Sequence, residues 1–195
     1  MMSYQTYITD AVVVGSYASN TADKSYLLLT ERAGMLYASA RSVREERSRQ
    51  RYALQDFSLV TVTLIKGKAG WRIGSVESHQ NFYTEAASRA ARGSIVRVTK
   101  TLRRYVHGEW PDETLFRLYS EALTLLVSDC EARAAYERFA EVRLLAHLGY
   151  VANNPILDEL FEMALHELPP VHIAEHELLL EEVYRGAQAA SHLER

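Results

Sequence analysis

The sequence predicts an α+β protein, with a small β-barrel at the N-terminus followed by an all-α helical domain. Over the first eighty residues, short runs of β-branched and aromatic residues alternate with turn signals, whereas later apolar residues recur at helical spacing. The charge also changes along the chain. Residues 1–110 hold sixteen Lys and Arg against nine Asp and Glu, and residues 111–195 hold six against sixteen. We therefore expect two domains, over residues 1–80 and 81–195.

Five segments of the first domain fit β-strands, because they are rich in residues that suit a pleated surface. These segments are Tyr4–Val14, Ser25–Thr30, Met35–Ala40, Phe57–Ile65 and Trp71–Glu77. A hairpin-length loop that ends in glycine separates the second and third segments, and a glycine-rich turn separates the last two. Closure into a barrel removes exposed strand edges, so five short strands predict a five-stranded OB-fold barrel.

After Gln80 the apolar residues follow a helical period. The expected helices cover residues 94–107, a stripe over residues 115–126, a segment from Ser128 to Gly149, a segment from Pro155, and Ala174–Ala190. Residues 94–107 are also rich in β-branched residues, so a strand is the alternative there.

Several residues of this part are typical of helix ends. Ser128 and Glu131 have the spacing of a capping box, in which each side chain bonds the other residue's backbone amide. Gly149 suits the position just after a helix, and Asn154-Pro155 suits a helix start. The pair Pro169-Pro170 should separate the last two helices.

The composition narrows the functional classes. The single cysteine, Cys130, excludes an intramolecular disulfide and a multi-cysteine zinc site. No apolar run approaches the length of a membrane span, and no signal peptide is visible, so we expect a cytoplasmic protein. His172 and His176 have the spacing of two metal ligands on one helix, which leaves a metal hydrolase as an alternative. No third ligand and no set of nucleophile, base and oxyanion donors is recognisable, so we expect no enzyme activity, cofactor or metal.

The most informative stretch lies between the third and fourth expected strands. It contains five arginines in eleven residues: Arg41, Arg44, Arg47, Arg49 and Arg51. Guanidinium groups match the geometry of phosphate, and clustered cations gain affinity by releasing counterions from nucleic acid. Carboxylates suit the same groups equally well. A solvated loop paired with Glu45 and Glu46, or a site for acidic peptide tails, therefore remains an alternative.

In an OB-fold, the loops after strands 1 and 4 flank the ligand-binding face. The basic residues in or beside these loops are Lys24, Lys66, Lys68 and Arg72. Proteins that bind single strands combine such charges with aromatic rings on which bases stack. Tyr37 and Tyr52 are candidates for stacking, whereas we expect Trp71 to fill the barrel core. The sequence therefore predicts a nucleic-acid interface on the barrel.

The order of these segments resembles the family of the bacterial recombination mediator RecO. The matching segments of the barrel are Lys24–Thr30, Glu31–Gly34, Ala38–Ser42, Leu54–Phe57 and Leu59–Ile65. A second match, Arg143–Tyr150, resembles the end of a helix in the family's C-terminal domain. Together the matches span most of residues 1–150 and imply an OB-fold joined to a helical domain.

The resemblance also implies a function. It implies binding of single- and double-stranded DNA, annealing of complementary strands, and help in loading recombinase, in the nucleoid of a bacterium. RecR and single-strand-binding protein are the implied partners, and Arg41 matches a basic position that the family uses towards DNA. Many relatives carry a four-cysteine zinc motif where this chain has Leu157-Asp-Glu-Leu160, so zinc is not carried over. The alternative is a non-enzymatic adaptor whose basic barrel surface binds acidic peptide tails.

Overall fold

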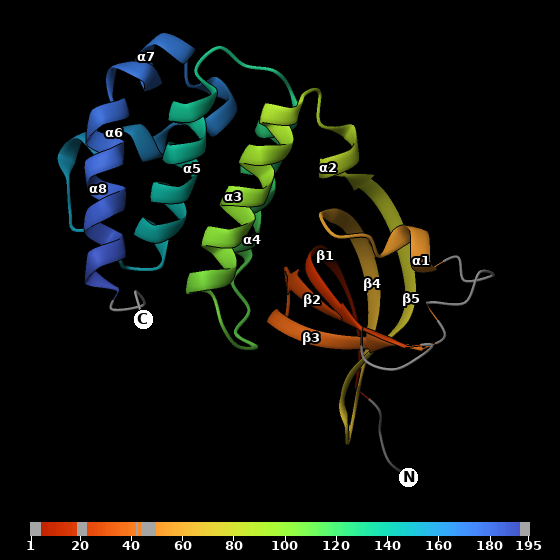
Figure 1. The fold of residues 1–195 in the computed structure, drawn as a ribbon. Helices are drawn as coiled ribbons and strands as arrows, with labels where there is room; N and C mark the ends of the chain where they lie inside the picture. The colour runs from red at the N-terminus through yellow and green to blue at the C-terminus, as the bar shows by residue number, and fades with distance from the viewer. Residues whose placement is uncertain (1–4, 19–22, 42, 44–49, 192–195) are drawn as a thin grey trace. The chain divides into compact units, whose positions relative to one another are not determined.

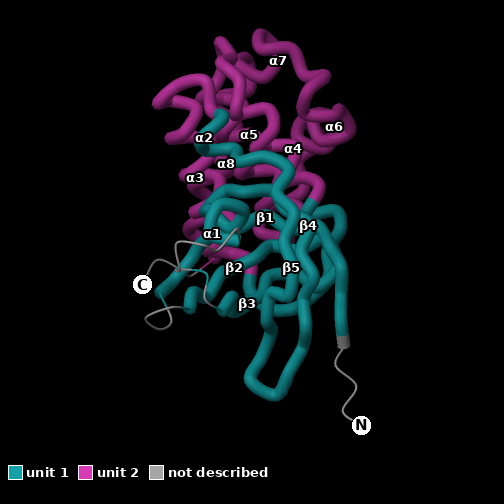
Figure 2. The backbone as a smooth tube through the Cα atoms, turned by 90° about the vertical axis from the view of Figure 1, so that its right-hand side faces the viewer, with its two compact units in different colours: residues 1–85, 107–116 teal, residues 86–106, 117–195 magenta. Residues whose placement is uncertain are grey.

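The computed structural model describes residues 5–18, 23–41, 43 and 50–191 (Figure 1). The chain divides into two compact units (Figure 2). The first consists of residues 1–85 and 107–116, and the second of residues 86–106 and 117–195.

The first unit is built around five strands: β1 (Gln5–Ala18), β2 (Lys24–Thr30), β3 (Gly34–Ala40), β4 (Ser58–Gly67) and β5 (Gly70–Asn81). They form a closed barrel in the order β1-β2-β3-β5-β4. Neighbouring strands are antiparallel except for β3 and β5, which pair in parallel over two residues. The prediction of an OB-fold barrel followed by helices is therefore confirmed, and all five expected strands are present.

The barrel core follows from the alternation of side chains along each strand. On β4, Val60, Val62 and Leu64 are fully buried, while the threonines between them are half-buried. Trp71 is also buried in this core, as predicted. On β1 the register with β2 shifts between Val13 and Gly15, which marks a bulge. Such bulges bend a strand and help a short sheet to close.

Residues 107–116 belong to the barrel unit, although they follow a long helix in the sequence. The Met35 amide donates a hydrogen bond to the Gly108 carbonyl over 3.0 Å. Gly34 has a φ of +72°, and a Cβ at this position would overlap the Trp110 carbonyl oxygen. The β2–β3 hairpin therefore needs glycine for its backbone conformation and for the close approach of the later segment.

Eight α-helices and one 3₁₀ turn lie within the described residues. They are α1 (Gln50–Ala53), α2 (Phe82–Glu85), α3 (Arg89–Tyr105), α4 (Glu113–Val127), α5 (Arg133–His147), α6 (Pro155–Glu162), the turn η1 (Leu165–Glu167), α7 (Pro170–Glu175) and α8 (Glu177–Ala190). Within this part of the chain, no helix is long and apolar enough to span a membrane.

The helices expected over residues 94–107 and Ala174–Ala190 have different bounds in the structure. The helix expected over residues 94–107 begins earlier, because Ser88 caps it and accepts a hydrogen bond from the Ala91 amide. The helix expected over Ala174–Ala190 is instead two helices, α7 and α8. Pro170 suits the first position of α7. His176, with a φ of −101° and a ψ of 7°, leaves the helical conformation between them.

The C-terminal end of α5 is formed as predicted. Gly149 has a φ of +81°, and its amide donates to the Ala146 carbonyl over 2.9 Å. The Tyr150 amide donates to the Leu145 carbonyl, also over 2.9 Å. These two bonds form the Schellman arrangement, in which a left-handed glycine satisfies the last carbonyls of a helix.

The capping box expected at the start of α5 is wrong. The helix begins at Arg133, and Ala132 precedes it without a side-chain cap. The Arg133 guanidinium instead donates to the Leu126 carbonyl over 2.8 Å and to the Ser128 carbonyl. It thereby satisfies carbonyls at the end of α4 and holds residues 128–132 outside the helix.

Candidate nucleic-acid interface

Two exposed tyrosines pair on the outer face of the barrel. The ring centroids of Tyr17 on β1 and Tyr37 on β3 lie 6.0 Å apart, with an angle of 53° between the ring planes. The two residues are 42% and 58% exposed. Tyr37 faces outward because its neighbours on β3, Leu36 and Ala38, point into the core. Tyr17 pairs with Ser25, which alternates with the core residue Tyr26 on β2. This pair presents two aromatic surfaces to solvent.

Strand pairing extends this surface across the barrel. Tyr17 pairs with Ser25 on β2, Ser25 pairs with Ser39 on β3, and Ser39 pairs with Arg72 on β5. Arg72 alternates with the core residues on either side of it, so it faces outward. We call the set Tyr17, Ser25, Tyr37, Ser39 and Arg72 the tyrosine face. It combines aromatic rings, hydroxyl groups and one guanidinium group.

Three predicted cations lie at the end of the barrel where β2 begins. Lys24 pairs with Ala40, the residue directly before Arg41, so both cations lie at the same end of the hairpin. Lys24 and Arg51 also line a cavity of about 320 Å³ together with Tyr26 and Val43. The fold therefore gathers Lys24, Arg41 and Arg51 from three separate segments of the sequence.

The tyrosine beneath Lys24 keeps its hydroxyl proton. Burial, and secondarily the charge of Asp56, raises the pKa of Tyr26 to about 12. The Lys24 ammonium lies 5.4 Å from the centroid of the Tyr26 ring, within the range of a cation–π interaction. Tyr26 is therefore neutral at physiological pH and does not cancel the positive charge of this end.

Lys66, near the end of β4, and Lys68, in the turn that follows, have different surroundings. The Lys66 ammonium binds the Glu109 carboxylate over 2.9 Å and lies 4.7 Å from the centroid of the Trp71 ring. The hydrogen bond from Lys66 is the main cause that lowers the pKa of Glu109. Lys68 is exposed in the following turn. Glu109 thus balances the charge of Lys66, a contact that the sequence did not reveal because 43 residues separate the partners.

The remaining predicted residues belong to the arginine-rich stretch. Arg44, Arg47 and Arg49 lie outside the described residues. Tyr52 is 68% exposed on α1, beside Arg51. The α1 helix is tied to β5 by Gln50, whose side-chain amide donates to the Gly74 carbonyl over 3.1 Å. The end of this stretch is therefore held next to the barrel.

Two other candidate centres can be compared with this interface. The rings of His172 and His176 meet edge to face at 5.2 Å, and Nδ1 of His176 lies 2.9 Å from the His172 carbonyl. Across the described ranges, no group of three or more His, Cys, Asp or Glu is placed to hold a metal ion. Burial is the main cause that raises the pKa of the Cys130 thiol, which disfavours the reactive thiolate.

No family model matches this chain, and no curated protein matches it. The functional interpretation of the barrel therefore depends on the residues and contacts described above.

Proposed function

We propose that the barrel binds DNA, and that the protein is a RecO-like mediator of recombinational repair. In this role it assists strand annealing or the loading of recombinase. The observation that supports the proposal most is the tyrosine face, where Tyr17 and Tyr37 lie beside Arg72 on the outer face of the barrel. Lys24 and Arg41 lie at the end of strands β2 and β3, which carry part of this face.

The aromatic pair favours nucleic acid over an acidic peptide as the ligand. Carboxylates and phosphates suit the cations equally well, but a chain of Asp and Glu has no aromatic group that can stack on the two exposed rings. Every nucleobase has a π-face that stacks on tyrosine, whatever its sequence. A surface with rings and cations together is therefore suited to the bases and phosphates of a single strand.

The same chemistry is tolerant of sequence, which a mediator requires. Phosphate contacts fix the position of a strand without reading it, and stacking on aromatic rings is likewise nonspecific. Residues 111–195, with six Lys and Arg against sixteen Asp and Glu, disfavour DNA by repulsion. This charge distribution supports the barrel as the DNA-binding part. RecR and single-strand-binding protein are the proposed partners, on the resemblance alone.

The proposal is tested by titrating labelled oligonucleotides of about thirty nucleotides, single-stranded and duplex, at several salt concentrations. A Tyr17→Ala/Tyr37→Ala variant should bind single strands about five- to more than a hundredfold more weakly, since stacking contributes about 1–3 kcal/mol per base. Duplex affinity should change less, because paired bases are already stacked. Tyr83→Ala is the matched control: Tyr83 is 40% exposed and stacks on Phe57.

Two outcomes would contradict the proposal. Unchanged single-strand affinity of the double variant would exclude the tyrosine face as the stacking surface. If the wild type bound an acidic peptide but no oligonucleotide at low salt, the adaptor function would replace DNA binding. Annealing of complementary oligonucleotides by the wild type, and its loss in the double variant, would support the mediator role.

A further inference from the structure

The helical unit carries a groove between the start of α5 and helices α7 and α8. Two hollows of about 600 Å³ and 340 Å³ share Ala134, Ala174 and Glu177 in their linings, so they adjoin each other. We call the surface that they form together the α5–α8 groove. It lies wholly within the second compact unit.

Large aliphatic side chains of the groove are exposed to solvent. Val171 on α7 is 71% exposed, and Leu178 on α8 is 87% exposed. The same two helices are anchored by other residues, because Ile173 and Leu180 are fully buried. Val171 and Leu178 therefore do not serve the packing of their own helices. Apolar groups gathered at a groove and surrounded by charge are typical of interaction sites.

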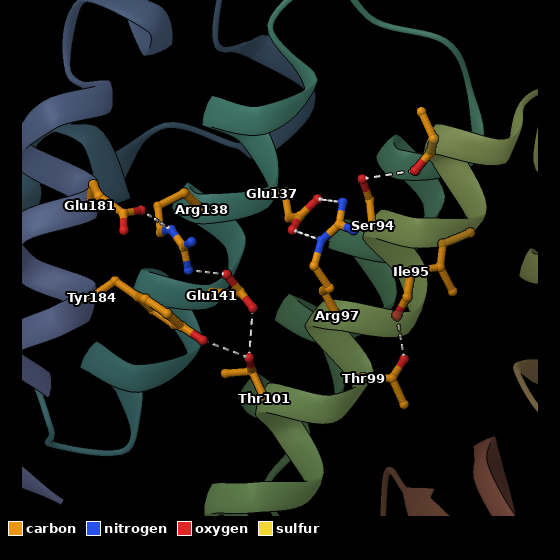
Figure 3. Close-up of polar contacts among 11 residues, drawn as sticks. Ser94, Ile95, Arg97, Thr99, Thr101, Glu137, Arg138, Glu141, Glu181 and Tyr184 are labelled. Carbon is orange, nitrogen blue, oxygen red and sulfur yellow. Dashed lines mark hydrogen bonds and ion pairs between the residues drawn. The ribbon is translucent and has the colours of Figure 1, made fainter. Parts of the chain in front are cut away.

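The groove has an excess of negative charge. Its two hollows are lined by five glutamates and three arginines. Each arginine is engaged within the protein (Figure 3 shows two of them). Arg97 binds Glu137, with Nη2 2.7 Å from Oε2, and Arg138 binds Glu141 and Glu181 over 2.6 and 2.7 Å. Arg133 donates to the carbonyls at the end of α4.

The network in Figure 3 also keeps these guanidinium groups in place. Burial by itself would raise the pKa of Glu137, but hydrogen bonds from Arg97 and Ser94 and the nearby guanidinium charge outweigh it, so the pKa is lowered. Arg138 lies 3.7 Å from the centroid of the Tyr184 ring. Glu137 is therefore ionised at neutral pH, and the arginines remain occupied with their carboxylates.

The acids at the edge of the groove are not neutralised in this way. Neither Glu131 nor Glu177 forms an ion pair with another described residue. The Glu175 carboxylate lies 4.0 Å from Nδ1 of His172. A ligand of this groove must match exposed aliphatic side chains together with these three carboxylates.

We propose that the α5–α8 groove binds a basic, amphipathic helical segment of a partner protein. Apolar side chains on one face of the segment would cover Val171 and Leu178, and flanking Lys or Arg would reach Glu131, Glu175 and Glu177. Such a segment complements the exposed aliphatic side chains of the groove and its charge. DNA and acidic peptide tails are repelled by the same carboxylates. Symmetric pairing of this groove with the groove of a second copy is disfavoured too, because residues 111–195 are themselves acidic.

The test uses the full chain and a labelled peptide of about five helical turns, with Leu along one face and Lys on the other. Fluorescence anisotropy should show saturable binding that weakens with salt. A Val171→Ser/Leu178→Ser variant should bind at least about tenfold more weakly. A Glu131→Gln/Glu177→Gln variant should bind more weakly at low salt and show a flatter salt dependence.

Matched controls come from the same unit. Ile156→Ser removes an exposed aliphatic side chain from α6, and Glu159→Gln/Glu182→Gln removes two exposed carboxylates that do not line the groove. These variants should bind the peptide like the wild type. A peptide with Glu in place of Lys, and one of the same composition without the Leu face, should not bind.

The proposal is overturned if the Leu/Lys peptide fails to bind at roughly 0.1 mM, or if both groove variants bind it like the wild type. It is also overturned if the wild type forms a dimer that Leu178→Ser abolishes, because the occupant is then a second copy. If the serine variant failed to fold, the glutamine variant would still decide. Glu131 and Glu177 are exposed and make no ion pair within the described residues, so replacing them with Gln removes no packing contact.

Discussion

At the scale of single residues, two buried threonines of α3 make hydrogen bonds of different kinds (Figure 3). Thr101 donates to the Glu141 carboxylate over 2.6 Å. Thr99 donates to the Ile95 carbonyl over 2.7 Å and lies 2.8 Å from the Tyr119 hydroxyl. Burial raises the pKa of Glu141, and the Thr101 hydroxyl is the largest of the influences that oppose this. The Thr101 bond thus stabilises a charge, whereas the Thr99 bonds are neutral.

This difference predicts a pH-dependent effect of Thr101→Val. A group with a raised folded-state pKa contributes stability that is complete below its unfolded pKa and is lost as the pH rises through the folded value. Without the Thr101 hydroxyl, the pKa of Glu141 rises further. The stability lost on raising the pH through this pKa then becomes larger. Thr101→Val should therefore cost about 1.5–3 kcal/mol at about pH 8, and about 0.5–1.5 kcal/mol at about pH 5.

Urea unfolding at the two pH values measures this cost. Thr99→Val is the matched control, since both threonines are buried on one helix, and its cost should be the same at both pH values. An equal cost of Thr101→Val at the two values would show that Glu141 is not the partner that matters.

At the scale of elements, the β2–β3 hairpin and residues 107–116 constrain each other. Gly34 and Gly70 both have positive φ, of +72° and +103°. Around a Cβ built on Gly70 there is nothing within 4 Å, whereas a Cβ on Gly34 would overlap the Trp110 backbone. Alanine substitutions at the two glycines therefore distinguish the loss of stability due to backbone conformation from the loss due to steric overlap.

We expect Gly70→Ala to destabilise the protein by about 1–2 kcal/mol, the cost of a left-handed residue with a side chain. Gly34→Ala should cost at least about twice as much, because backbone atoms must also move apart. Denaturant midpoints of the two variants provide the comparison. Equal destabilisation by the two substitutions would mean that residues 107–116 move away from the added Cβ without a measurable loss of stability.

The elements also show what could be predicted from the sequence. The strands and the Gly149 helix end were predictable because period-2 alternation and left-handed glycine are local signals. The capping box was not, because Arg133 reaches back to carbonyls of the preceding helix and displaces the helix start. A local spacing rule does not include that competition.

The candidate site was predictable only in part, for a similar reason. From the sequence, Tyr37 and Arg72 could be recognised as an aromatic and a basic residue near basic loops. Their placement on one face depends on the two-residue parallel pairing between β3 and β5. The position of Tyr17 beside Tyr37 depends on the bulge between Val13 and Gly15. Such pairings join distant segments, and nothing in either segment alone specifies them.

At the scale of the whole molecule, the charge distribution predicts how DNA binding responds to salt. Replacing Arg44, Arg47 and Arg49 together with Gln should lower the affinity for all sequences alike. Each phosphate that the variant no longer neutralises should reduce the slope of log K against log salt by about 0.7 for single strands and about 0.9 for duplex DNA. Oligonucleotide titrations at several salt concentrations measure both quantities.

The control for this triple variant replaces three exposed acids, Glu159, Glu162 and Glu182, with Gln. It should leave the slope nearly unchanged. If the arginine variant kept the wild-type affinity and slope for DNA but no longer bound an acidic peptide, the stretch would be a protein-docking site.

The return of residues 107–116 to the barrel has a consequence during synthesis on the ribosome. The Gly34–Met35 corner emerges early, but its contacts at Gly108 and Trp110 are translated only after α3 has been made. At about 5–20 residues per second, the roughly seventy intervening residues amount to a delay on the order of 4–15 s. During that interval the β2–β3 hairpin lacks the segment that covers it in the folded protein. A chaperone that recognises unpaired backbone can bind the hairpin at this stage.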